Sequence, residues 1–145
     1  MRANRTRRIL DRGGVALGVM IFEMATPGVG RLAAAAGADF VLLDLEHTSW
    51  SIDRVAPVLA AMRADEVTPL LRVPATAPHL ISGALDAGAM GVMVPMVEDE
   101  AQAAAAVRAA TFPPDGARGT ACCSGTRCTP TGWGPRWPTP TASGW

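Results

Sequence analysis

Short apolar runs alternate along the chain with stretches whose apolar residues recur at helical spacing. The apolar runs have the length of buried strands, and we expect strands at residues 15–22, 38–43, 67–73 and 89–95. Their starts, near residues 15, 39, 67 and 89, are 22 to 28 residues apart, which leaves room for one helix between each pair. This alternation is typical of right-handed parallel βαβ units, so the sequence predicts an α/β fold.

Local signals predict where the helices begin and end. The expected helices are residues 2–11, ended by Gly13-Gly14; Thr26-Pro27 to 36, closed by Gly37; 52–62, capped by Ser51; Pro78 to Gly88; and 101–110. Pro57 lies inside the apolar stripe of the third helix, where proline is expected to kink or interrupt it. Three acidic residues, 98–100, precede the last helix, where they suit the helix dipole.

Four βα units make half of a (β/α)8 TIM barrel, whose usual size is about 250 residues. An open doubly wound sheet is the alternative architecture. From Thr111 onward the chain has no Leu, Ile, Val or Met, and six of the 12 prolines, three of the four tryptophans and all three cysteines lie between Pro113 and Trp145. We therefore predict a partial TIM-barrel domain over residues 1–112 and an irregular, disordered Pro/Gly/Trp-rich tail over residues 113–145.

Charge and hydropathy exclude some partners. The formal net charge is zero, which gives no support for binding to nucleic acid or to an anionic membrane. No apolar run approaches the roughly 20 residues needed to cross a bilayer. The first 12 residues contain five arginines but are followed by no long apolar segment, so we expect no secretory signal and a cytoplasmic protein. An arginine-rich helix touching nucleic acid remains the alternative to a solvated helix face.

Candidate chemistry follows the second expected strand. Asp44, Glu46 and His47 come at its carboxyl end, where α/β proteins place their ligands. A histidine beside two carboxylates is a candidate general base, because a carboxylate partner fixes the imidazole tautomer. A strand that simply ends in a polar loop is the alternative. Cysteine chemistry is not expected, since Cys122, Cys123 and Cys128 match neither a CxxC motif nor a zinc module.

The segment Phe40–His47, read as FVLLDLEH, resembles the second-strand motif of the HpcH/HpaI-type aldolases, relatives of the citrate lyase beta subunit. The resemblance continues, in the family's order and near its spacing, through residues 71–74 (LRVP), 85–89 (LDAGA), 94–97 (VPMV) and 112–119 (FPPDGARG). It covers roughly residues 10 to 119.

This resemblance implies a (β/α)8 barrel that cleaves 4-hydroxy-2-oxo acids reversibly to pyruvate, or a similar 2-oxo acid, and an aldehyde. It also implies a divalent cation, Mg²⁺ or Mn²⁺, that stabilises the enolate. By the same resemblance His47 is the base and acts with Asp44 through a metal-bound water, Glu46 supports that network, and Arg72 binds the oxo acid and polarises its carbonyl. Asp86 would reach the site of a neighbouring subunit, which implies a homo-oligomer. The alternatives are a surface ion pair for Arg72 and a charged helix end for Asp86.

The chain also departs from the family. The family's metal ligands, a Glu and an Asp, follow strands five and six, whereas the last acidic residue here is Asp115. We therefore expect no metal ligands in this chain, and we interpret the change of composition as a shift of reading frame near codon 120. Three interpretations stay open: a metal-dependent aldolase, a non-catalytic fragment whose unpaired strand edges favour self-association, and a small βα ligand-binding protein.

Overall fold

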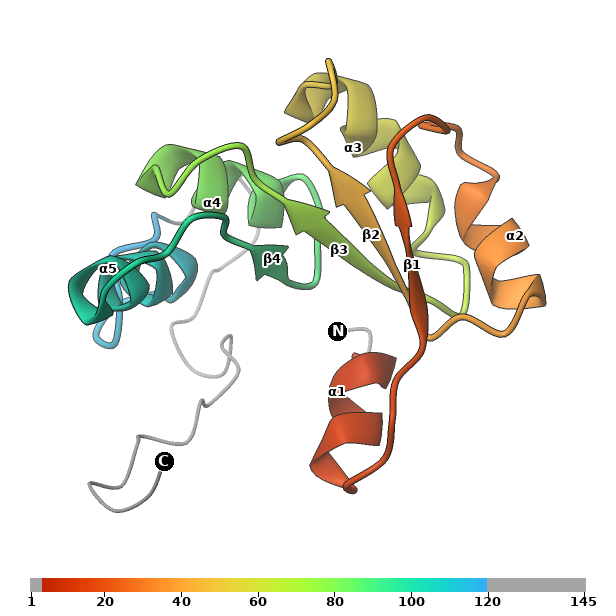
Figure 1. The fold of residues 1–145 in the computed structure, drawn as a ribbon, viewed down its shortest axis with the longest axis horizontal. Helices are drawn as coiled ribbons and strands as arrows, with labels where there is room; N and C mark the ends of the chain where they lie inside the picture. Colours follow the sequence, from red (N-terminus) through yellow and green to blue (C-terminus); the bar gives the residue numbers. More distant parts are fainter. Residues whose placement is uncertain (1–3, 120–145) are drawn as a thin grey trace, which may run out of the picture.

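The computed structural model describes residues 4–119, which form a parallel sheet with helices between the strands (Figure 1). The elements are α1 (Arg5–Asp11), β1 (Gly18–Ile21), α2 (Val29–Ala35), β2 (Phe40–Asp44), α3 (Ile52–Ala61), β3 (Thr68–Arg72), α4 (Pro78–Asp86), β4 (Val92–Met93) and α5 (Glu100–Ala110). The strand order is β1-β2-β3-β4. A doubly wound sheet would reverse this order at a switch point, so the sequential order confirms half of a barrel-type fold.

The two faces of β2 have different neighbours. Val41 and Leu43 are fully buried in the core formed with the helices, whereas Phe40, Leu42 and Asp44 alternate with them and face the other side of the sheet. The parallel register pairs Phe40 with Thr68 and Asp44 with Arg72. This register brings two charged residues from different strands side by side at the carboxyl end of the sheet.

Helix α1 lies at the amino ends of the strands, below the sheet in Figure 1. Its Arg5 forms an ion pair with the buried Asp39 at 3.0 Å, and the Thr6 backbone N–H donates to Thr68 Oγ at 3.2 Å. Arg7 pairs with Asp11 on the same helix. Two of the arginines at the start of the chain therefore serve contacts within the fold.

Three predicted boundaries differ from the structure. The expected strands at 15–22 and 89–95 are shorter, as β1 and β4, because each has a hydrogen-bonded neighbour on one side only among the described residues. Helix α2 begins at Val29, later than Thr26-Pro27. Helix α3 continues through Pro57. Proline has no N–H to donate to the carbonyl of Asp53, one turn earlier, but both residues are on the exposed side of the helix, where water can replace the lost bond.

The start of the predicted tail is irregular but fixed to the domain. Residues 113–119 contain no strand, and the Arg118 backbone N–H donates to Thr111 O at 2.9 Å. Arg118 also stacks over the Phe112 ring at 4.7 Å. The remaining residues of the predicted tail, with the three cysteines, lie outside the described part.

Helix ends and hydropathy follow the sequence pattern elsewhere. Asp99 caps α5 by accepting from the Gln102 backbone N–H at 2.7 Å, and Pro78 opens α4 as expected.

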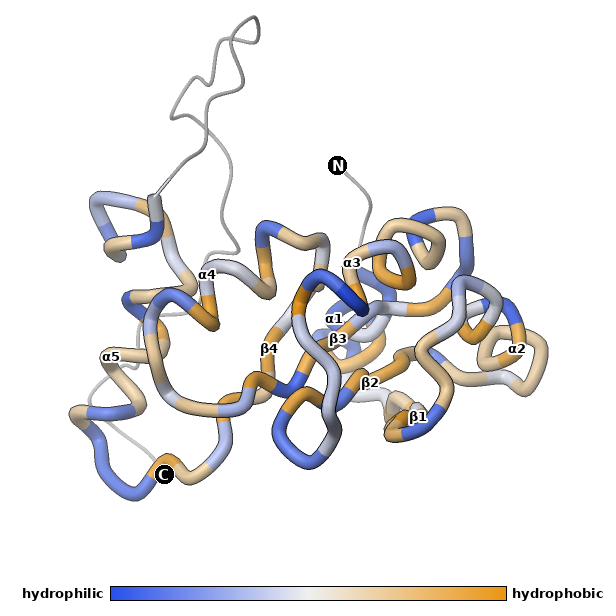
Figure 2. The backbone as a smooth tube through the Cα atoms, turned by 90° about the horizontal axis from the view of Figure 1, so that it is seen from above, coloured by the Kyte–Doolittle hydropathy of each residue, from blue (hydrophilic) through white to orange (hydrophobic). Residues whose placement is uncertain are grey.

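Seen from above, hydrophobic segments mark the strands and hydrophilic ones lie mainly in the surrounding loops (Figure 2). Within residues 4–119, the helices are too short or too polar to span a bilayer.

Candidate functional site

The Asp44 carboxylate is the centre of a polar cluster at the carboxyl end of β2. Its side chain is fully buried, with 0% exposure. Arg72 donates from Nε to Oδ1 at 2.7 Å and from Nη2 to Oδ2 at 2.9 Å. The backbone N–H groups of Glu46 and His47 donate to the same two oxygens at 2.9 and 3.1 Å. The loop after β2 is thus folded around one buried anion.

These hydrogen bonds change the acidity of both partners. The bond from Arg72, reinforced by the two backbone N–H groups, lowers the pKa of Asp44 from 3.8 to about 2, although burial acts in the opposite direction. The same bond to Asp44 raises the pKa of Arg72. Asp44 therefore stays ionised at any pH near neutrality, and it holds the Arg72 guanidinium in place.

Part of the hydrogen-bonding capacity of Arg72 is not used by Asp44 and Glu46. A guanidinium has five N–H groups. Asp44 takes two of them, on Nε and Nη2, and Glu46 Oε2 lies 3.1 Å from Nη1. Among the described residues, at least one N–H on each of Nη1 and Nη2 is not used by these contacts, and the side chain is 17% exposed. These two groups form a fork that suits a carboxylate or a 2-oxo acid.

His47 lies at the same end of the sheet as Arg72. Its imidazole Nε2 is 3.7 Å from Glu46 Oε2, and its side chain is 66% exposed. Asp44 does not orient the imidazole, because Arg72 and the two backbone N–H groups already occupy both carboxylate oxygens. The nearest carboxylate to the imidazole is Glu46, which also contacts Arg72 and so links the two groups.

Thr48 is a member of the cluster that the sequence analysis did not single out. Its hydroxyl donates to the Asp44 backbone carbonyl at 2.7 Å and accepts from the Trp50 backbone N–H at 3.2 Å. Thr residues in turns often form hydrogen bonds of this kind with the backbone. The position of Thr48, four residues after the end of the strand, was the sequence signal that could have identified this role. Thr48 keeps the loop closed on Asp44.

Asp86 is not part of this cluster within the chain. It is the last residue of α4, and helices in βαβ units run antiparallel to the strands, so it lies toward the amino ends of the sheet. There it accepts from Arg118 Nη2 at 2.6 Å. A role of Asp86 at the site of a neighbouring subunit stays a prediction.

The cluster lacks the donor set of a metal site. Among residues 4–119, no three His, Cys, Asp or Glu side chains come together in a way that could hold a metal ion. Both oxygens of Asp44 are engaged by N–H donors, and Glu46 is beside a guanidinium. The described residues therefore do not fit a divalent cation.

Comparison with known proteins places this site in a family. The model of the HpcH/HpaI aldolase/citrate lyase family matches residues 19–131, which include the whole cluster and extend past Gly119. The chain belongs to this family.

Curated members of the family are similar over most of the chain. The hydroxypyruvate/pyruvate aldolase of Roseovarius nubinhibens is 36% identical over 117 residues, 81% of this chain and 45% of the relative. The 2-dehydro-3,6-dideoxy-6-sulfogluconate aldolase of Pseudomonas putida is 37% identical over 113 residues, 78% of this chain and 44% of the relative. The chain thus spans about half the length of the curated relatives it matches.

Solved structures agree with the fold. An HpcH/HpaI aldolase from Desulfitobacterium hafniense superposes with a TM-score of 0.78 at 28% identity, over 83% of this chain and 46% of that one. A family protein from Burkholderia cenocepacia gives 0.72 at 36% identity, over 82% and 49%. The four βα units correspond to the first half of a TIM-barrel-type aldolase fold, and the family supports an aldolase or lyase function in general.

Proposed function

We propose that this chain carries the half of an aldolase site that binds a 2-oxo acid and transfers a proton during cleavage of a 4-hydroxy-2-oxo acid. The observation that carries the proposal is the anchored guanidinium. Arg72 contacts Asp44 through Nε and Nη2 and Glu46 through Nη1, so its guanidinium is held by two carboxylates. Such a fork binds the carboxylate and the 2-oxo group of the substrate, where negative charge develops in the enolate.

His47 is the group that can move the proton. Cleavage needs a base to take the proton of the C4 hydroxyl while the C3–C4 bond breaks, which releases the aldehyde and leaves the enolate of the 2-oxo acid. Protonation at C3 then gives pyruvate or its analogue. The imidazole lies at the same strand ends as Arg72, is open to a substrate, and has Glu46 as its neighbour.

A divalent Mg²⁺ or Mn²⁺ is part of the proposal only through the family resemblance. The described residues do not offer its ligands. No step is therefore assigned to the metal. In the proposal, Arg72 is the cation that faces the negative charge developing on the substrate.

A second candidate is ligand binding without turnover. The 66% exposure of the His47 side chain favours it, because a base in open solvent gains little from the water exclusion that enzymes use. In that case the Arg72 fork holds a 2-oxo acid and no bond is broken.

Pyruvate release from 4-hydroxy-2-oxoheptanedioate, assayed with and without Mn²⁺, tests the first proposal. His47→Ala is expected to lower the rate about 100-fold or more, which is the usual contribution of a general base. The chain has one other histidine, His79, exposed on α4, and His79→Ala is the matched control. Equal rates in both variants would contradict the assignment of His47, and binding of pyruvate without release by the wild type would favour the second candidate.

A further inference from the structure

Two strands flank Arg72, and they present different chemistry to it. On β2 its register partner is Asp44, and on β4 its register partner is Met93. The Val73 backbone N–H donates to the Met93 carbonyl at 3.1 Å and fixes this register. Register partners in a sheet project their side chains from the same face. Asp44, Arg72 and Met93 therefore form one row across three strands, at the carboxyl end of the sheet.

The row of side chains beneath this one is apolar. Leu70 pairs with Leu42, and each stands two residues before the charged residue of its own strand, so both project from the same face as Arg72. On β4 the residue two before Met93 is Gly91, and a Cβ there would be 3.0 Å from Leu70 Cδ2. The Leu70 side chain thus lies against Gly91, and a molecule beside Met93 has an apolar floor.

The charges around Arg72 decide which side of the guanidinium an anion takes. Asp44 accepts from Nε and Nη2, and Glu46 Oε2 lies 3.1 Å from Nη1. Both carboxylates belong to β2 and the loop that follows it. They repel a bound anion, because like charges a few ångströms apart raise the free energy. The β4 side of the guanidinium, next to Met93, carries no such charge among the register partners and is the favoured side.

We infer that Met93 is a specificity-determining residue, which packs against C3 of a 2-oxo acid bound to Arg72 and selects acids whose C3 is small and apolar. This inference rests on the proposed function, because it takes Arg72 as the group that binds the acid. The carboxylate and the 2-oxo group of such an acid are adjacent and both suit the fork, so C3 extends away from it. A methyl group at C3 fits against the Met93 side chain, whereas a hydroxyl there would be buried without a partner.

Isothermal titration of the full 145-residue chain with pyruvate, hydroxypyruvate and oxalate tests the role of Met93. Oxalate has two carboxylate groups and no C3, so it probes Arg72 alone. The wild type should bind pyruvate more tightly than hydroxypyruvate. Met93→Gln keeps the length of the side chain and adds an amide, so it should shift the ratio of these two dissociation constants about tenfold toward hydroxypyruvate. The dissociation constant of oxalate should stay within about twofold of the wild type, because the fork is unchanged.

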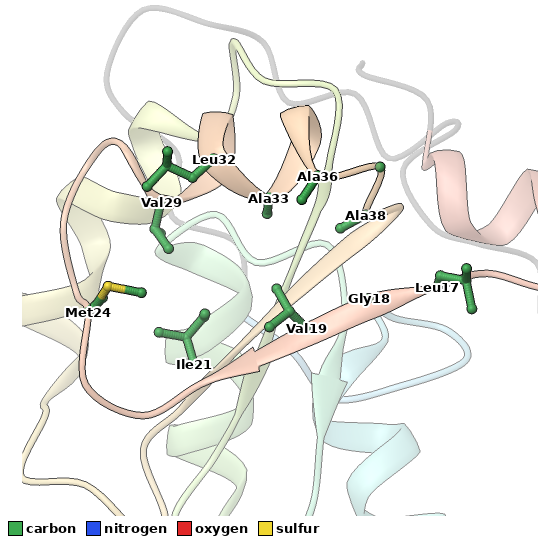
Figure 3. Close-up of a pocket in the computed structure, with 11 residues that line it drawn as sticks. Leu17, Gly18, Val19, Ile21, Met24, Val29, Leu32, Ala33, Ala36 and Ala38 are labelled. Atoms are coloured by element: carbon green, nitrogen blue, oxygen red, sulfur yellow. The ribbon is translucent and has the colours of Figure 1, made fainter.

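Met24→Gln is the matched control for the same substitution. Met24 lines the groove of about 370 Å³ between β1 and α2, where Figure 3 shows it near Val29. This variant should leave all three dissociation constants unchanged. Circular dichroism establishes that each variant is folded. If Met93→Gln does not fold, Met93→Ala replaces it, and the space it opens should let 2-oxopentanoate bind about tenfold more tightly than to the wild type.

The outcomes separate this inference from the proposed function. Oxalate binding by the wild type with an unchanged ratio in Met93→Gln would overturn the role of Met93 and leave the proposed function standing. The same holds if the wild type binds oxalate but not pyruvate, or if Met24→Gln shifts the ratio as much as Met93→Gln does. A folded wild type that binds no oxalate would overturn both, because Arg72 would then hold no acid for Met93 to select.

Discussion

Arg72 donates two hydrogen bonds to the buried Asp44 carboxylate, from Nε at 2.7 Å and from Nη2 at 2.9 Å, across the parallel register of β2 and β3. A paired arrangement of this kind fixes the guanidinium plane as well as its position. The geometry makes Asp44 the anchor of Arg72 and Glu46 the bridge between Arg72 and His47, and we propose that Arg72 faces the ligand.

Removal of the guanidinium should destabilise the fold through the charge left behind. Arg72→Met leaves Asp44 buried without its main partner, so the free energy of unfolding should fall by about 3 kcal/mol. Urea unfolding at neutral pH measures it. The double variant Asp44→Asn with Arg72→Met should lose less than the sum of the two single losses, by about 1 kcal/mol or more. Additive losses would mean that the pair is not coupled.

Acid should weaken the fold through Asp44. Its pKa is lowered to about 2 in the folded protein, against 3.8 as the ordinary value, so the unfolded chain binds more protons between these pH values. The contribution, about 2 kcal/mol, is complete above roughly pH 4 and is lost as the pH falls toward 2. Urea unfolding at pH 5, 4 and 3 should show a smaller decline for Asp44→Asn than for the wild type. Equal declines of the unfolding free energy in the two proteins would show that protonation of Asp44 is not what weakens the fold in acid.

Close packing at β1 makes one glycine essential. A Cβ at Gly18 would overlap the ring of Phe40 on the paired strand, whereas a Cβ at Gly28 would have no atom closer than 3.9 Å. Gly18→Ala should therefore lower the free energy of unfolding by about 1–3 kcal/mol, the usual cost of overpacking. Gly28→Ala is the control and should be nearly neutral. Equal effects in thermal unfolding would show that the Phe40 ring moves away freely.

The hydroxyl of Thr48 should control the loop that carries Glu46 and His47. Thr48→Val removes the bond to the Asp44 carbonyl and leaves the Trp50 N–H without its acceptor, at a cost of about 1 kcal/mol. Thr48→Ser keeps both bonds. Amide hydrogen exchange at Glu46, His47 and Trp50 should be faster in the Val variant only. Unchanged exchange in that variant would mean that the loop is held by Asp44 alone.

Much of the fold was predictable because local signals and burial agree. The run from Phe40 to Leu43 is apolar on both faces and became β2, and Pro78 begins α4 as its missing N–H requires. The outer strands were predicted too long, because their length depends on a neighbour rather than on apolar residues. Pro57 was expected to disturb α3, but the helix continues through it, and both Pro57 and Asp53, one turn earlier, are exposed residues.

The members of the site were predictable, but their partners were not. The sequence predicts a histidine beside two carboxylates at the end of the second strand, but it does not show what each carboxylate contacts. The register of β2 on β3 decides instead that Arg72, 28 residues away, is the partner of Asp44. Register is a long-range property, so no local pattern around Asp44 reveals it. Glu46, in the loop two residues after Asp44, contacts both Arg72 and His47.

Binding of oxalate, a planar dianion that resembles the enolate of pyruvate, tests the central claim most directly. Isothermal titration calorimetry should show that the wild type binds oxalate and that Arg72→Lys binds it at least tenfold more weakly, about 1.4 kcal/mol, because lysine cannot provide the fork. Circular dichroism confirms that both proteins are folded. Equal affinity in the two folded proteins, or no binding by the folded wild type, would contradict the account.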